Sequence, residues 1–202
     1  MSHYYDENPE VESDELLFTY SYDNCKLELV TDSGVFSKGK IDFGSDLLVK
    51  TFLKAYPPGP TKRILDVGCG YGPIGLMIAK TSPHHEVTMV DVNQRALSLS
   101  RKNRKKNRIE NVEIKESDGL SQVEVGAYDF MLTNPPIRAG KKVVHSILED
   151  AYKVLKQDGA LYVVIQKKQG MPSAKQKMQD TFNNVEVLAK DKGYYILRST
   201  KA

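Results

Sequence analysis

The sequence has no tryptophan and only two cysteines, Cys25 and Cys69, which lie far apart. Two distant cysteines make neither a disulfide framework nor a metal-ligand pattern. No apolar run approaches the length of a membrane span, and the polar, acidic N-terminus does not fit a secretory signal peptide. His84, His85 and His145 have no partners at metal-ligand spacing. We therefore expect a cytoplasmic protein in a reducing setting, with no membrane segment and no bound metal.

Charge is distributed unevenly along the chain, although its net value is only +3 at pH 7. Six acidic residues lie between positions 6 and 15, and six basic residues lie between positions 101 and 108. Such asymmetry is compatible with a polyanionic partner. The basic run falls on a predicted amphipathic helix, where charged residues most often form a solvated face instead.

Strand-like and helix-like patterns follow one another along the chain. Two β-type runs around Asp23-Asn24 predict a hairpin, and an apolar stripe predicts a helix over about 43–56. The predicted strands are 16–22, 26–31, 63–67, 86–91, 111–115, 128–133 and 160–165, and the later predicted helices are 73–81, 94–107, 142–156 and 173–182. We expect helix 142–156 to end at Asp158-Gly159. The last runs, 185–189 and 193–198, predict an antiparallel hairpin.

This alternation predicts an α/β fold built on a doubly wound, mostly parallel seven-stranded sheet with right-handed crossovers. A small β-hairpin extension precedes the sheet, and an antiparallel hairpin completes it. We divide the chain into residues 1–60, an extension containing a tail, a hairpin and a helix, and residues 61–202, the main domain.

A glycine-rich turn is the main functional signal. Three glycines follow Asp66 at alternate positions: Gly68, Gly70 and Gly72. Glycine lets a ligand approach the backbone closely, and the next helix points free N–H groups at the same place. Pro73 stands where the dinucleotide pattern G-x-G-x-x-G requires glycine. A nucleoside ligand without a diphosphate, such as S-adenosylmethionine, therefore fits better, and a plain strand-to-helix turn is the alternative.

Other candidates follow from the rule that ligands bind at the carboxyl ends of strands in an open α/β sheet. Asp91, with Val92 beside it, is placed to accept hydrogen bonds from ribose hydroxyls. The alternative is a helix N-cap, a role that Asn93 can fill. Asp118, after Ser117, is placed to accept from an adenine amino group, or else is only a turn residue.

The string Asn134-Pro135-Pro136-Ile137 closes the strand 128–133. Its two prolines fix φ and hold the backbone rigid at the strand end. The Asn134 amide oxygen and the Pro135 carbonyl are two acceptors that can position a planar exocyclic amine for methylation. The alternative is an Asx-turn that merely ends a strand.

Basic residues also gather at the predicted strand ends. Five lie there: Arg138, Lys141, Lys142, Lys167 and Lys168. They are better candidates for RNA phosphate contacts than the basic helix. We expect His145 to lie in packing or on the surface rather than to act as a base, and Cys69 to be a small side chain under the ligand.

These strings resemble a known family. Asp66-Val67-Gly68-Cys69-Gly70-Tyr71-Gly72 resembles motif I of class I S-adenosylmethionine-dependent methyltransferases, and Asn134-Pro135-Pro136-Ile137 resembles their amino-methylating motif IV. Asp42-Phe43-Gly44-Ser45-Asp46-Leu47-Leu48 and Lys167-Lys168-Gln169-Gly170 are similar to the ribosomal RNA small subunit methyltransferase C family, which makes N2-methylguanosine.

The resemblance implies a Rossmann-like methyltransferase sheet, S-adenosylmethionine as cofactor, and ribosomal RNA or the small ribosomal subunit as partner. The implied cofactor site comprises Asp66, Gly68, Cys69, Gly70, Gly72, Asp91, Val92, Ser117, Asp118 and Asn134. The implied catalytic residues are Asn134, Pro135, Pro136 and Ile137, and the implied RNA contacts are Arg138, Lys141, Lys167 and Lys168. Phe36, Ser37 and Gly44 are implied to lie in a segment that closes over the cofactor.

Two departures from the family pattern affect the expected substrate. Many amino-methyltransferases stack an aromatic residue on the flipped base after Asn-Pro-Pro, but this chain has Ile137. The chain is also too short for the family's second domain, so the hairpin, the tail or a partner subunit is expected to recognise substrate. The expected function is guanine-N2 methylation of 16S ribosomal RNA. The alternatives are N-methylation of another RNA or a protein glutamine, and non-catalytic RNA or ribosome binding. The oligomeric state stays open between monomer and homodimer.

Overall fold

The computed structural model describes residues 14–33, 39–56 and 59–202. Phe36 and Ser37, expected over the cofactor, lie outside these residues. In chain order, the elements are β1 (Leu16–Tyr22), β2 (Cys25–Thr31), α1 (Phe43–Ala55), β3 (Arg63–Val67), α2 (Pro73–Thr81), β4 (Glu86–Asp91), α3 (Gln94–Lys106), β5 (Val112–Glu116), β6 (Tyr128–Thr133), η1 (Ile137–Ala139), α4 (Lys141–Val154), β7 (Leu155–Gln166), η2 (Lys167–Gln169), α5 (Met171–Phe182), β8 (Glu186–Asp191) and β9 (Tyr194–Thr200).

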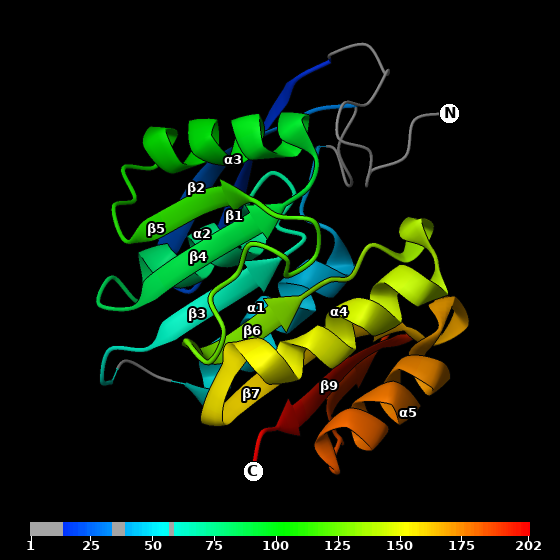
Figure 1. Ribbon diagram of the computed structural model, residues 1–202. Coiled ribbons are helices and arrows are strands. Elements are labelled where there is room, and N and C mark those ends of the chain that lie inside the picture. The colour runs from blue at the N-terminus through cyan, green and yellow to red at the C-terminus, as the bar shows by residue number, and fades with distance from the viewer. Residues whose placement is uncertain (1–13, 34–38, 57–58) are drawn as a thin grey trace.

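The central sheet has seven strands in the order β5-β4-β3-β6-β7-β9-β8 (Figure 1). Strands β3 to β7 pair in parallel, and β9 runs antiparallel to both β7 and β8. The strand order reverses between β3 and β6, so a crevice opens beside their carboxyl ends. The predicted α/β fold and its two antiparallel hairpins are therefore confirmed.

The boundary between α4 and β7 differs from the prediction. We expected a helix over 142–156 that ends at Asp158-Gly159, but α4 ends at Val154 and β7 begins at Leu155. Leu155 fits the apolar stripe of the helix, yet it is fully buried and pairs with Tyr128 in the sheet. Asp158, at φ 67°, lies within an irregularity of β7 before pairing resumes. Tertiary pairing thus ends the helix earlier than periodicity alone indicates.

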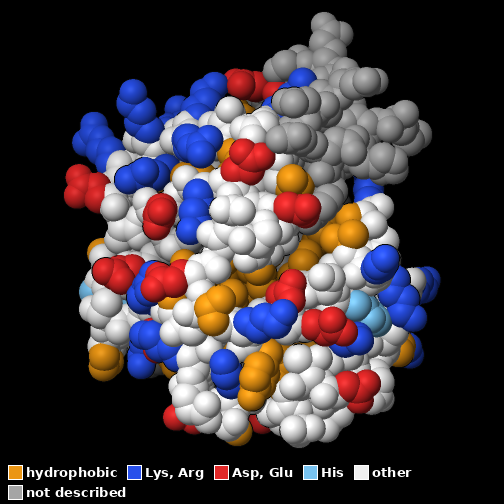
Figure 2. All heavy atoms as spheres, in the orientation of Figure 1, with side chains coloured by type: hydrophobic (Ala, Val, Ile, Leu, Met, Phe, Trp, Pro, Cys, Tyr) orange, Lys and Arg blue, Asp and Glu red, His pale blue; other side chains and the backbone are white. Residues whose placement is uncertain are grey.

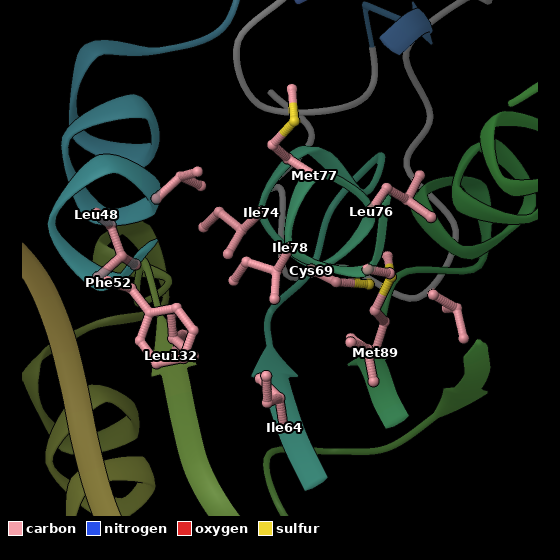
Figure 3. Packing of buried hydrophobic residues seen from close by; sticks show 14 of the residues in the cluster. Leu48, Phe52, Ile64, Cys69, Ile74, Leu76, Met77, Ile78, Met89 and Leu132 are labelled. Carbon is pink, nitrogen blue, oxygen red and sulfur yellow. The ribbon is translucent and has the colours of Figure 1, made fainter. Parts of the chain in front are cut away.

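Two apolar layers sandwich the sheet. Helices α1, α2 and α3 cover one face, and α4 and α5 cover the other. Figure 3 shows the first layer, where Leu48 and Phe52 of α1 face the α2 side chains Ile74 and Ile78 above the sheet. All seven α2 residues from Pro73 to Ala79 are buried. Packing therefore surrounds the first two turns of α2, and this holds the glycine turn that leads into the helix.

The N-terminal hairpin is held to α3 by two asparagines one helical turn apart. Asn103 is fully buried; its amide accepts from Val30 N at 2.8 Å and donates to Val30 O at 2.9 Å and Tyr71 O at 2.8 Å. Asn107 makes the same pair of bonds to Glu28, where the contact is exposed. The hairpin and α1 thus pack on residues of the main domain, and the division at residue 60 stays a prediction.

Asp66, on β3, has a buried carboxyl group that faces the start of α2. Its Oδ2 accepts the Gly75 N–H at 3.0 Å, whereas Oδ1 has no hydrogen-bond partner among the described residues. The pKa of Asp66 is raised to about 7: burial is the main cause, the Gly75 N–H opposes it, and the nearby Asp91 charge adds to the rise. The protonated carboxyl is therefore the form that this position favours.

The hairpin contact predicts unequal costs for two matched substitutions. Asn103→Ala leaves the Val30 backbone groups and Tyr71 O buried without partners, and it should lower the free energy of unfolding by roughly 2–4 kcal/mol. Asn107→Ala exposes its partners to water and should cost no more than about 1 kcal/mol. Chemical denaturation measures both values. Equal losses in the two variants would show that burial of the Asn103 amide is not what holds the hairpin.

The raised pKa predicts that Asp66 makes stability depend on pH. The unfolded carboxyl ionises near its ordinary pKa of 3.8 and the folded one near 7, so the folded state binds the proton more tightly. The stabilisation is complete below about pH 4 and is lost as pH rises through 7. Relative to Asp66→Asn, which cannot titrate, the wild-type free energy of unfolding should fall by roughly 2–3 kcal/mol between pH 5 and pH 8. A difference that stays constant over this range contradicts the buried, protonated carboxyl.

Candidate active site

A pocket of about 310 Å³ opens at the carboxyl ends of β3, β6 and β7. Segments far apart in the chain line it: Asp42, Ser45, Gly68, Cys69, Gly70, Tyr71, Pro73, Ile74, Asn134, Pro135, Pro136, Ile137, Arg138, Ala139, Val164, Ile165, Gln166, Gln169 and Tyr194. The glycine turn and the Asn-Pro-Pro string, 62 or more residues apart in the chain, therefore line the same pocket.

The glycine turn gives the pocket a bare backbone floor. Gly68 and Gly70 have φ values of 72° and 59°, a region that side-chain-bearing residues rarely adopt. A Cβ on Gly68 would meet nothing closer than the Asn134 carbonyl oxygen at 3.8 Å, so it would project into open pocket space. The N–H groups of Gly68 and Cys69 both donate to Val90 O, at 2.9 and 3.0 Å. These bonds fasten the turn to the end of β4.

Asp91 holds the same turn from the side. Its Oδ2 accepts the Gly70 N–H at 2.9 Å, and its Oδ1 accepts the Asn93 N–H at 2.9 Å. Asn93 in turn caps α3 by accepting from Ala96 N at 2.9 Å. Asn93 rather than Asp91 therefore caps α3, and the buried Asp91 carboxylate lies beside the turn rather than in the pocket lining.

The remaining glycine of the motif serves packing. Gly72 is the N-cap of α2 at φ 103°, and a Cβ there would lie 2.8 Å from Leu76 Cδ1 and 3.0 Å from Met89 Cε. Gly75 approaches β4 more closely than Gly72 does, because a Cβ added at Gly75 would lie 2.6 Å from Met89 Cγ. These two glycines bring α2 against β4, and neither lines the pocket.

Cys69 lies under the turn as a buried thiol. Its Sγ lies 3.7 Å from Ser100 Oγ, which itself donates to Gly70 O at 2.6 Å. Burial raises the pKa of the Cys69 thiol well above its ordinary value, and the Asp91 and Asp66 charges raise it further. A neutral thiol is a poor nucleophile, so Cys69 fits a packing role better than a covalent one.

Asn134 is oriented by two side chains of the N-terminal extension. Its Nδ2 donates to Asp42 Oδ2 at 3.2 Å and to Ser45 Oγ at 3.1 Å. A carboxylate can only accept, so the amide nitrogen must face Asp42. The Asn134 oxygen makes no hydrogen bond among the described residues and is left as an acceptor at the pocket.

Sequence reasoning missed Asp42 and Ser45 as site residues, although a local signal was present. Asp42 is the N-cap of α1 and accepts the Ser45 N–H at 3.0 Å, a pattern typical of helix starts. That signal predicts the cap but not the contact with Asn134, which is 92 positions away.

The rest of the Asn-Pro-Pro string is stiffened by a tight turn. The Pro135 carbonyl accepts the Ile137 N–H at 2.9 Å, which leaves one of its lone pairs for a ligand. Ile137 is half-buried and lines the pocket, as do two aromatic residues that sequence reasoning did not select, Tyr71 and Tyr194. The Tyr194 ring lies 5.5 Å from the Phe43 ring. The pocket lining therefore includes aromatic residues although Ile137 is not one.

Other predicted residues lie outside this pocket. Val92 and Ser117 follow β4 and β5, and Asp118 lines a separate hollow beside α4. Gly44 lies behind the pocket, where a Cβ would meet Tyr194 Cε1 at 2.9 Å. Arg138 lines the pocket and is exposed; the other predicted RNA contacts, Lys141, Lys167 and Lys168, are exposed at the starts of α4 and η2.

The histidines and acids of the described residues form no further site. His145 is half-buried, and burial lowers its pKa, with Lys141 and Lys177 acting in the same direction. Among residues 14–33, 39–56 and 59–202, no three His, Cys, Asp or Glu side chains are grouped as metal ligands. Within the same ranges, every helix is too short or too polar to cross a membrane.

Comparisons with known proteins identify the family. The model of the methyltransferase small domain matches residues 26–198. Uncharacterized protein YbxB from Bacillus subtilis (strain 168) is 48% identical over 200 residues, 98% of either chain. Ribosomal RNA small subunit methyltransferase C from Hahella chejuensis is 37% identical over 142 residues, which are 68% of this chain and 40% of that protein.

A solved structure shares the fold. The T. Thermophilus 16S rRNA N2 methyltransferase, in complex with AdoMet and guanosine, has a TM-score of 0.84 and 24% identity, and covers 96% of this chain and 52% of its own. This chain spans about half the length of such named ribosomal RNA methyltransferases. Because the family model covers most of the sequence and the sheet is that of a Rossmann-like methyltransferase, the chain belongs to the methyltransferase small domain family.

Proposed function

We propose that this protein transfers a methyl group from S-adenosylmethionine to the exocyclic N2 amine of a guanine in small-subunit ribosomal RNA. The observation that carries the proposal is the fixed amide of Asn134. Its nitrogen is occupied by Asp42 and Ser45, and its oxygen is left as an acceptor in the same pocket as the bare backbone of Gly68 and Gly70.

The residues present fit the cofactor. Gly68 leaves room for a ligand against the backbone, Gly70 also lines the pocket, and the pocket extends over Pro73 and Ile74 at the start of α2. The buried Asp91 carboxylate holds the turn through the Gly70 N–H, and we expect it to accept a ribose hydroxyl when the cofactor is bound. Bound S-adenosylmethionine supplies an electrophilic methyl group on sulfur and leaves as S-adenosylhomocysteine.

The Asn-Pro-Pro string would position the acceptor. The Asn134 oxygen and the free lone pair of Pro135 C=O both accept from the amine, so its two hydrogens lie toward them and its lone pair faces the methyl carbon. The new C–N bond forms as the C–S bond breaks, and the electron pair stays on sulfur. The extra N2 proton then leaves to water. Such an amine is weakly nucleophilic, so orientation contributes more than a strong base.

Positive charge around the pocket mouth favours RNA over a neutral glutamine side chain. Arg138, Lys141, Lys167 and Lys168 are exposed and form no ion pair among the described residues. The Lys167 N–H donates to Gly193 O at 2.9 Å, which places η2 beside the β8–β9 turn that carries Lys192. Figure 2 shows further Lys and Arg side chains over α3, at the upper left. Neutralising phosphates in this way gives binding that weakens with salt.

The fixed amide predicts the effect of one substitution. Asn134→Ala should lower kcat for methylation of small ribosomal subunits by about 100-fold or more, because an acceptor for the amine is lost. S-adenosylmethionine affinity should change little, since the glycine turn is intact. Radiolabel transfer and isothermal titration measure these two quantities. Asn107→Ala, on the outer end of α3, is the matched control and should keep wild-type kcat. Activity of Asn134→Ala within twofold of wild type would rule out this role for Asn134.

A further inference from the structure

Asp42 presents an unused carboxylate oxygen to the pocket. Its Oδ2 is engaged twice, by the Ser45 N–H at 3.0 Å and by Asn134 Nδ2 at 3.2 Å. Its Oδ1 has no hydrogen-bond partner among the described residues, and the residue lines the pocket beside Asn134 and Tyr194. The cap of α1 and the bond to Asn134 fix where this oxygen lies, so it is a preorganised acceptor.

Two acceptors therefore stand side by side on the pocket wall, Asp42 Oδ1 and Asn134 Oδ1. An ionised carboxylate has no hydrogen to donate, and the donor end of the Asn134 amide is already used. The two side chains are hydrogen-bonded to each other and both line the pocket, so one ligand in the pocket can reach both remaining oxygens. The matching ligand edge must present two adjacent donors.

Only guanine among the common RNA bases with an exocyclic amine presents that pair. Its ring N1–H lies next to its N2 amine. Adenine places the N1 lone pair beside its N6 amine, and cytosine places the N3 lone pair beside its N4 amine. Either base would turn an unprotonated ring nitrogen toward a carboxylate, where two lone pairs repel and a partly buried charge stays unpaired.

We propose that Asp42 selects guanine by accepting the hydrogen bond of the ring N1–H, while Asn134 accepts from the N2 amine that receives the methyl group. This assignment rests on the proposed function and adds to it the residue that chooses the base. Asn134 alone cannot make the choice, because all three bases offer an amine to it. Tyr194 lines the same part of the pocket and offers the base a ring to pack on.

Asp42→Asn is the variant that separates base selection from structure. Asparagine is as good a helix N-cap as aspartate. Its amide oxygen can keep both present contacts, to the Ser45 N–H and to Asn134 Nδ2. The change therefore turns the free pocket atom from an acceptor into an N–H donor and leaves the fold contacts in place. Asp46→Asn is the matched control, because it also removes a carboxylate from α1. The Asp46 carboxylate contacts Tyr20 and Lys50 and does not line the pocket.

The test uses two RNA fragments that differ at one base. The first step is to map the N2-methylguanosine that the wild-type protein makes in small-subunit ribosomal RNA. Fragments are then made with guanine or 2,6-diaminopurine at that position. The latter keeps the amine at C2 but has a lone pair at N1. Values of kcat/KM are measured for wild type, Asp42→Asn and Asp46→Asn.

Wild type and Asp46→Asn should prefer guanine by at least about 100-fold. In Asp42→Asn the preference should fall to within about tenfold, because the new N–H can pair with the N1 lone pair. An unchanged preference in a folded Asp42→Asn that binds S-adenosylmethionine overturns the assignment and leaves the proposed function standing. If that variant turns over neither fragment, the affinities of the two fragments are measured with S-adenosylhomocysteine bound. A guanine preference in affinity that is unchanged from wild type then overturns the assignment, and a reduced preference supports it. Absence of any N2-methylguanosine from the wild-type reaction overturns the proposed function and this assignment with it.

Discussion

The pocket depends on the hydrogen bonds that fasten the turn after β3 to the end of β4. Val90 O accepts two turn N–H groups, and the Asp91 carboxylate accepts a third from Gly70. Without them the positive-φ glycines would be free to adopt many conformations, because glycine loses more entropy on ordering than any other residue. With them, the backbone is held open at the crevice where the strand order reverses. The packing of Gly72 and Gly75 against Leu76 and Met89 closes the other side of the turn.

A second set of contacts makes the N-terminal extension part of the site. The hairpin is bound to α3 through Asn103, which also bonds the carbonyl of Tyr71 inside the glycine motif. Asp42 and Ser45 at the start of α1 then orient Asn134 at the end of β6. The extension thus contacts Asn134 directly and is linked to the glycine motif through Asn103. Asp42 and Ser45 of the extension therefore contribute directly to the pocket.

Much of the fold could be predicted from the sequence because its signals are local. Alternating strand and helix patterns, the glycine turn and the Asn-Pro-Pro string each lie within a few adjacent residues. The end of α4 could not be predicted, since Leu155 satisfies the helical stripe and only its pairing with Tyr128 places it in β7. Asp42 was missed as a site residue for a related reason. Its capping role is visible in the sequence, but its contact with Asn134 spans 92 positions and exists only once the sheet has formed.

If the proposed substrate is a base, the pocket offers an aromatic ring elsewhere than at Ile137. The aromatic ring of Tyr194, on β9, lines the pocket and packs near Phe43. Burial raises the pKa of Tyr194, and Asp42 raises it further, so its hydroxyl stays neutral beside the acceptor pair. We propose that this acceptor pair orients guanine so that S-adenosylmethionine methylates its N2 amine. The most direct test is mass spectrometry of nucleosides from small ribosomal subunits incubated with the protein and S-adenosylmethionine carrying a deuterated methyl group. Label in N2-methylguanosine is the predicted result; label only in another nucleoside or in protein, or no label, would contradict the account.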